Sequence, residues 1–124
     1  DIHVEVPNVQ YKDLTSNSTC ESSEEIRERV TKARKVQLKR FQGLKYSTNS
    51  RMSTRTMKKH CLLDSKAEEL LHQAMTELNI SARGYNKILK VGRTIAALDQ
   101  SEDVRREHIS EAIQYRNLDR DLWK

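Results

Sequence analysis

Arg83 is the residue whose position most needs a chemical explanation. It stands in SARGYNKILKVGRTIAAL, residues 81–98, where apolar residues recur at helical spacing and Ser81 is placed to cap the first turn. The dipole of a helix favours an anion at this end and disfavours a fixed cation. An arginine that meets a phosphate would explain the position. A solvent-exposed arginine without a role is the alternative, and the helical pattern alone leaves both open.

A second group of cations is a candidate for contacts with nucleic acid. The net charge is +5. Residues 1–60 carry 13 Lys and Arg against 7 Asp and Glu, whereas residues 61–124 carry 10 against 11. The basic half could face DNA or another anion, although the charge alone favours a solvated helix face. The candidates are Lys32, Arg34, Lys35, Lys39, Arg40, Lys45, Arg51, Arg55, Lys58 and Lys59.

Several classes of chemistry are not expected. The sequence has no P-loop glycine pattern, no GxGxxG, no GxSxG and no HExxH, so an enzyme complete in itself is not predicted. Cys20 and Cys61 are far apart, and without CxxC or HxxxH spacing we expect no metal site. Unpaired thiols suit the cytoplasm. No apolar run approaches the roughly 18 residues that a membrane span needs.

Helices dominate the predicted fold. Caps and apolar periodicity predict them over 22–41, 53–60, 63–78, 81–98 and the segment REHISEAIQYR, with Val104 docking ahead of the last. Residues 1–7, DIHVEVP, alternate in polarity and predict a short strand without a partner. Residues 8–21 are predicted as an irregular linker, with Tyr11 and Leu14 as possible anchors. The prediction is an all-α fold of four or five helices with an orphan N-terminal strand.

Other residues are assigned structural roles. Arg93 is expected to form an ion pair with Glu107 or Glu111. His72 and His108 are expected to be ordinary surface or boundary residues. Tyr85 is expected in the core with its hydroxyl at the edge.

The strongest blocks of the sequence resemble a known family. DIHVEVP, ESSEEIRERVTKARKVQLKRF, HCLLD, LNISARGYNKILKVGRTIAALDQSE and REHISEAIQYRNLDR are together similar to the C-terminal part of bacterial magnesium-chelatase-like AAA+ ATPases, the ComM/YifB family. The resemblance extends from residue 1 to about residue 120. Gly84 and Gly92 depart from it, because relatives commonly carry alanine at both positions. Gly92 lies on the buried stripe, where it allows close helix approach.

The resemblance implies a role for each part of the chain. Residues 1–21 would be the last strand of an AAA+ core and a linker, 22–120 a helical C-terminal lid, and 121–124 a tail. An upstream P-loop domain would hold ATP and Mg, and Arg83 would be the sensor 2 arginine at its γ-phosphate. The chain alone would not hydrolyse ATP. The parent would be a homo-hexameric motor, with DNA remodelling by branch migration the favoured activity.

Alternatives to this interpretation remain open at the level of the sequence. Chelatase work on a porphyrin uses the same motor parts as helicase work on DNA. The chain could also be an autonomous basic module that binds nucleic acid. A protein–protein adaptor is the third alternative.

Overall fold

The computed structural model describes residues 1–15 and 20–121, with the side chains of Asp13 and residues 117–121 left out. The elements in order are α1 (Tyr11–Thr15), α2 (Ser23–Arg40), the 3₁₀ helix η1 (Asn49–Arg51), α3 (Thr54–His60), α4 (Ser65–Glu77), α5 (Ala82–Leu98) and α6 (Arg106–Asp121). The predicted all-α fold is confirmed. In the described part of the chain, none of these helices is both long and apolar enough to cross a membrane.

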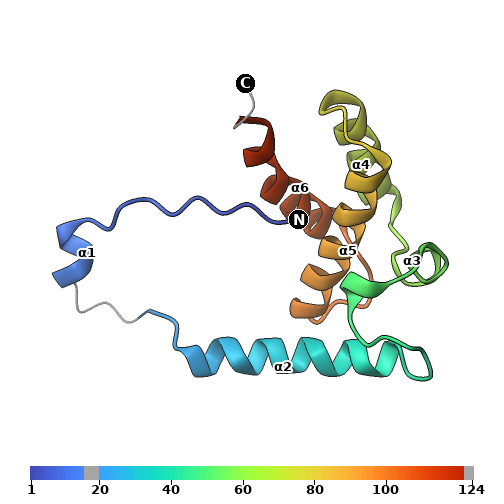
Figure 1. Cartoon of the computed structure of the whole chain (residues 1–124), viewed down its shortest axis with the longest axis horizontal. Helices are drawn as coiled ribbons and strands as arrows, with labels where there is room; N and C mark the ends of the chain where they lie inside the picture. The colour runs from blue at the N-terminus through green and yellow to red at the C-terminus, as the bar shows by residue number, and fades with distance from the viewer. Residues whose placement is uncertain (16–19, 122–124) are drawn as a thin grey trace.

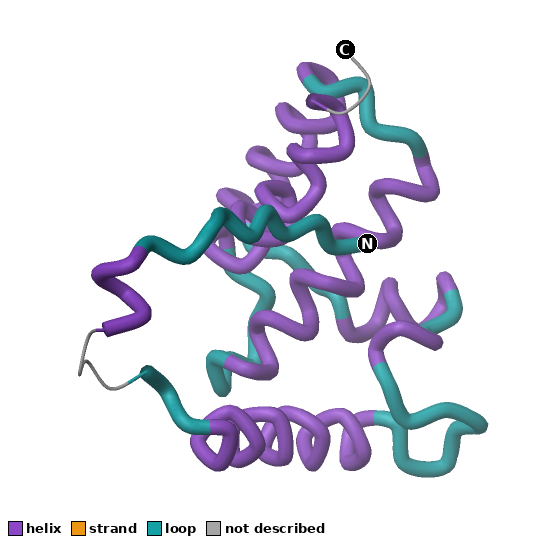
Figure 2. The backbone as a smooth tube through the Cα atoms, turned by 60° about the vertical axis from the view of Figure 1, so that its left-hand side comes forward, coloured by secondary structure: helices purple, strands orange, loops and turns teal. Residues whose placement is uncertain are grey.

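The predicted N-terminal strand is wrong for this chain. Residues 1–10 form no regular element, and the one bridge of strand type in the described residues joins Leu63 to Val104. A strand needs a neighbour to receive its backbone hydrogen bonds, and here only the His3 N–H finds one, donating to the Tyr115 carbonyl at 2.9 Å. The segment instead runs away from the bundle and shows as loop in Figure 2. Its apolar side chains Val4 and Val6 are exposed.

The linker prediction is partly corrected by the short helix α1. Tyr11 and Leu14 are not anchors, because their side chains are 78% and 71% exposed. Figure 1 shows α1 standing away from the rest of the chain. A single turn of helix with no packing partner has no burial to stabilise it. Residues 16–19 of the predicted linker and 122–124 of the predicted tail lie outside the described residues.

The core lies where α5 meets α6 and α4 meets α6. Ile88 and Ala96 of α5 and Ile109 of α6 are fully buried, together with Val104, which docks as predicted. Gly92 faces this contact, since a Cβ there would lie 3.0 Å from Ile109 Cδ1. The absence of a side chain therefore permits the close approach of α5 to α6, as the sequence indicates.

Local caps set the helix boundaries. Ser22 and Glu25 form the predicted capping box at α2, and Ser53, Asp64 and Ser81 cap α3, α4 and α5. The chain then turns after α4 through Asn79, whose φ of 50° is the left-handed conformation expected for it. These caps are local, which is why the sequence predicted them.

A buried polar contact joins α2 to the bundle. The Asn49 N–H donates to Gln37 Oε1 at 3.0 Å, and Asn49 Nδ2 donates to Thr94 Oγ1 at 3.1 Å. Asn49 and Gln37 are both buried, and Phe41 packs into the core beside them. The first half of α2 lacks such support, because Ile26 and Val30 are 43% and 45% exposed. The helix is thus attached through its C-terminal half, along the lower edge of the molecule in Figure 1.

Candidate functional site

Arg83 lies in the first turn of α5, held there by the Ser81 cap. Ser81 Oγ accepts a hydrogen bond from the Gly84 N–H at 3.1 Å, and its carbonyl accepts from the Tyr85 N–H at 2.9 Å. The Arg83 side chain is exposed. Among the described residues, no ion pair involves it. The fold fixes the backbone that carries this guanidinium and leaves its five N–H donors in solvent.

Tyr85, next in the same turn, is half-buried and packs against the core. This matches the expectation of a core ring with its polar end near the surface.

Arg93 is not in the predicted ion pair with Glu107 or Glu111. Its side chain is only 2% exposed and donates to backbone carbonyls: from Nη1 to Glu102 at 2.7 Å and from Nη2 to Ser101 at 2.8 Å. Nη1 also donates to the His60 carbonyl at 3.4 Å. The prediction failed because the turn after α5 brings carbonyls closer than any carboxylate of α6. Arg93 therefore pins that turn and the end of α3.

Burial also shifts the pKa values of Arg93 and of the neighbouring Cys61 and His60. Desolvation lowers the pKa of Arg93, and nearby Arg40 lowers it further. Burial raises the pKa of the Cys61 thiol to about 11, against the opposing effect of Arg93. Burial, then Arg40, Lys59 and Arg93, lower the pKa of His60. Arg93 and Arg40 thus form a partly desolvated cationic region, in which Arg93 stabilises the fold through its hydrogen bonds to backbone carbonyls.

His108 is buried, contrary to the prediction of a surface or boundary residue. Its Nδ1 accepts from the Arg105 N–H at 2.9 Å, which leaves Nε2 of the neutral ring to donate to Asp99 Oδ2, also at 2.9 Å. The ring joins the end of α5 to the start of α6. His72, by contrast, is exposed on α4 as expected.

Nine of the ten candidate nucleic-acid contacts have exposed side chains. Arg40 is the exception, because it is half-buried and donates to Asn49 Oδ1 at 3.4 Å. On α2, the cations Lys32, Lys35 and Lys39 share the face opposite the buried stripe, at spacings of three and four residues. Arg34 also lies on α2, Lys45 lies in the following loop and Arg51 in η1, and α3 carries Arg55, Lys58 and Lys59.

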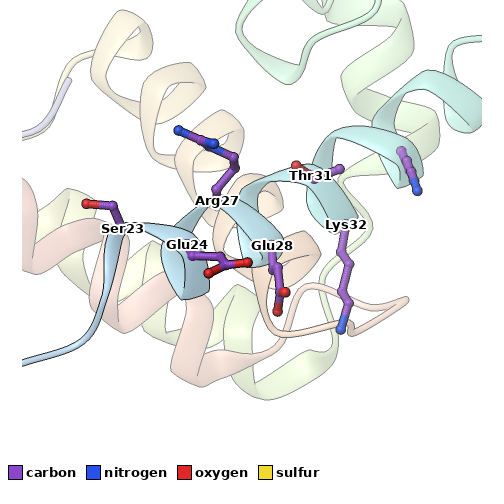
Figure 3. A pocket seen from close by; sticks show the side chains of 7 residues that line it. Ser23, Glu24, Arg27, Glu28, Thr31 and Lys32 are labelled. Atoms are coloured by element: carbon purple, nitrogen blue, oxygen red, sulfur yellow. The ribbon is translucent and has the colours of Figure 1, made fainter.

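A shallow hollow on α2 does not form a reactive site. Its lining comes from that one helix: Ser23, Glu24, Arg27, Glu28, Thr31, Lys32 and Lys35. Figure 3 shows Arg27 pointing away from Glu28 and Lys32, and the ion pairs of the described residues do not join Arg27 to either residue. Within the part of the chain that the structure describes, no group of three His, Cys, Asp or Glu side chains is placed to hold a metal ion.

An apolar groove runs between the N-terminal segment and α5. Ile2 and Val4 line one side, and Val91, Ile95 and Leu98 of α5 line the other. The ion pair from Lys87 Nζ to Asp1 Oδ1, at 3.0 Å, closes one end. The lining of the groove also includes the charged residues Lys90 and Glu111, which the ion pairs of the described residues do not join.

Comparison with known proteins places the chain in a family. Residues 20–116 match the family described as magnesium chelatase, subunit ChlI C-terminal. The chain belongs to this family. The match includes α2 to α5 and most of α6, with Arg83 and all ten basic candidates inside it.

Curated relatives extend the match to the N-terminal segment. Competence protein ComM of Haemophilus influenzae is 33% identical over 125 residues, covering 100% of this chain and 24% of that protein. The uncharacterised protein YifB of Escherichia coli is 37% identical over 100 residues, 81% of this chain and 19% of YifB. YifB of Salmonella typhimurium is 32% identical over 121 residues, 97% of this chain and 23% of that protein. The chain thus spans about a fifth to a quarter of the length of these relatives.

The sequence analysis missed Arg116, on α6. Its Nη2 lies 3.4 Å from the position that a Cβ on Gly84 would occupy, beside the turn that carries Arg83. The contact joins residues 32 positions apart, which helical periodicity does not reveal. The available signal was Gly84 itself, a glycine in the first turn of a predicted helix.

Proposed function

We propose that this chain is the helical lid of a magnesium-chelatase-like ATPase, and that Arg83 contacts the γ-phosphate of ATP held by a P-loop domain. The observation that carries the proposal is the exposed guanidinium of Arg83, which the fold does not use, in a chain of this family. A guanidinium presents paired donors in a plane, a geometry that suits phosphate oxygens. The Ser81 cap fixes the backbone from which the side chain reaches.

The chain's own residues fit one contact with the nucleotide. Arg83 would donate to phosphate oxygens, whereas the sequence has no glycine-rich phosphate loop. The described residues also offer no acidic cluster for Mg. ATP, when bound, supplies the γ-phosphoryl group whose charge Arg83 meets. The remaining contacts belong to the P-loop domain, so the chain alone should not hydrolyse ATP.

A movement at Arg83 can be transmitted to the other helices of the lid through α5. The residue is rigidly carried by α5, and the C-terminal part of that helix contacts α2 through Thr94 and Asn49. A contact at the start of α5 that exists with ATP and not with ADP would therefore shift the whole bundle as a unit. In a homo-hexameric parent, such shifts would drive the remodelling of a partner, with DNA the favoured substrate.

Substitution of Arg83 tests the phosphate contact. Arg83→Ala in the intact polypeptide should reduce ATP turnover by about 10- to 150-fold, because a hydrogen bond to a charged group contributes about 1.5–3 kcal/mol. Lys66→Ala, an exposed cation on α4, is the matched control and should leave turnover unchanged. Unchanged turnover in Arg83→Ala, with ATP hydrolysis by the parent intact, would reject the proposal.

A second function, binding of nucleic acid, is favoured by an acid-free stretch. Residues 29–63 contain eleven Lys and Arg and no Asp or Glu. They include the nine exposed candidates, so phosphates approaching this surface meet no carboxylate from the same segment. Such a surface supplies the sequence-independent part of DNA binding.

The salt dependence of DNA binding tests this second function. The affinity of the chain for a labelled duplex should fall with a log–log slope of about 0.9 per phosphate contact. Replacing Lys32, Lys35 and Lys39 by glutamine should reduce that slope by up to about 3 units. The control replaces Lys66, Arg105 and Arg106, which neighbour acids, and should change the slope little. Low salt exaggerates electrostatic attraction. If the chain does not bind DNA even at 50 mM salt, binding of nucleic acid is excluded as its function.

A further inference from the structure

The turn that carries Arg83 meets a second arginine, Arg116 of α6. Nη2 of Arg116 lies 3.4 Å from the point where a Cβ on Gly84 would stand. Gly84 is buried and Arg116 is half-buried, so this guanidinium lies against the backbone of the turn. A Cβ at position 84 would lie in ordinary van der Waals contact with this guanidinium.

The two arginines are close enough to reach one group. Consecutive Cα atoms are about 3.8 Å apart, so Arg116 Nη2 lies within about 9 Å of the Arg83 Cα. The ion pairs of the described residues include neither arginine. Two cations in one small region repel each other, and an anion that both arginines contact would reduce that repulsion.

Gly84 keeps the space beside the turn open. A Cβ there would approach Ile80 Cγ2 to 2.7 Å, as well as the Arg116 guanidinium. A glycine inside a helix costs about 1 kcal/mol relative to alanine. The steric reason for a glycine at this position is therefore Ile80, whereas Arg116 approaches the turn to contact distance.

We propose that Arg116 is a second guanidinium for the terminal phosphate, and that together with Arg83 it selects a nucleoside triphosphate over a diphosphate. This inference rests on the proposed function of Arg83. Arg83 is carried by α5 and Arg116 by α6, so a γ-phosphate held by both would join the ends of two helices. A diphosphate would lack the group that both arginines contact.

Nucleotide binding to variants of the intact polypeptide tests the proposal. Arg116→Ala should weaken ATP binding by about tenfold or more, leave ADP binding unchanged, and lower turnover. Arg116→Lys retains the charge without the planar guanidinium, and its affinity for ATP should fall between those of wild type and Arg116→Ala. Arg106→Ala, an exposed arginine at the other end of α6, is the matched control and should behave as wild type.

The outcomes separate this inference from the proposed function. Loss of ATP preference in both Arg83→Ala and Arg116→Ala supports both. A defect in Arg83→Ala alone overturns the role of Arg116 and leaves that of Arg83 standing. An unaffected Arg83→Ala overturns the proposed function and this inference with it. A parallel loss of ATP and ADP binding in both Arg116 variants, with a lower urea midpoint for the 124-residue chain, would identify a structural role and also overturn the inference.

Discussion

The two ends of α5 place the same residue type in opposite environments. Near its start, Arg83 is exposed and no ion pair of the described residues involves it. Ten residues later, Arg93 is 2% exposed, and its two Nη atoms donate to the carbonyls of Ser101, Glu102 and His60, while its Nε is buried without a partner. The helix alone does not distinguish the two arginines. The turn that follows α5 does, because it folds back over Arg93.

This difference separates a structural arginine from one that is available to a ligand. A buried guanidinium makes its hydrogen bonds within the protein, so its removal lowers the stability of the folded state. An exposed guanidinium donates its hydrogen bonds to water. Its removal therefore changes the binding of a partner that displaces this water, and not the stability of the fold. Variants at the two ends should therefore separate stability from function.

The largest effect is expected at the buried end. Arg93→Met retains much of the volume but removes the donors to three carbonyls, and should lower the free energy of unfolding by about 2–4 kcal/mol. Urea unfolding of the 124-residue chain, followed by circular dichroism, measures the loss. Arg83→Ala is the control and should stay within about 0.5 kcal/mol of wild type. Similar losses in the two variants would contradict the contrast between the ends.

Alanine substitution of Gly92 and Gly84 tests the packing around α5, with smaller expected changes in the free energy of unfolding. Gly92→Ala should destabilise by about 1 kcal/mol net, because overpacking against the buried Ile109 exceeds the gain in helix propensity. Gly84→Ala should cost at least as much, since its Cβ would lie 2.7 Å from Ile80 Cγ2, and that methyl group moves only by rotation about the stiff χ1 of a β-branched side chain. The same urea series measures both. A stabilised Gly92→Ala variant would show that α5 and α6 separate easily.

The smallest effect is expected in the dependence of stability on pH. Because the pKa of His60 is lowered in the fold, the unfolded chain binds a proton more readily. The stability from this residue is present above about pH 6.5, the ordinary histidine pKa, and is lost as pH falls through the lowered value. His60→Gln should flatten the urea midpoint between pH 7 and pH 5 relative to wild type. An unchanged slope would assign the pH dependence to other groups.

The sequence predicted the features that depend on neighbours along the chain. The caps Ser22, Ser53, Asp64 and Ser81 satisfy donors two or three residues away, and the apolar stripe of α5 follows from its own period. The conformation of Asn79 is equally local.

The errors concern contacts that join distant parts of the chain. Arg93 reaches carbonyls of a turn whose path no helical pattern specifies, and His108 is buried because Asp99 lies across that turn. The strand at residues 1–7 failed because alternation shows only that a segment could pair, while its partner must come from elsewhere. The approach of Arg116 to Gly84 is also of this kind.

The one-sided attachment of α2 makes this helix a lever. Its fulcrum is the contact of Gln37 with Asn49, and its free arm extends back to Ser23. The 14 residues from Gln37 back to Ser23 span about 21 Å of helix. A tilt of about 10° at the fulcrum would therefore move the tip by about 4 Å, which is between two and three residues of helical rise. A small rotation of α5, passed through Thr94 to Asn49, would thus become a larger displacement at the far end of α2.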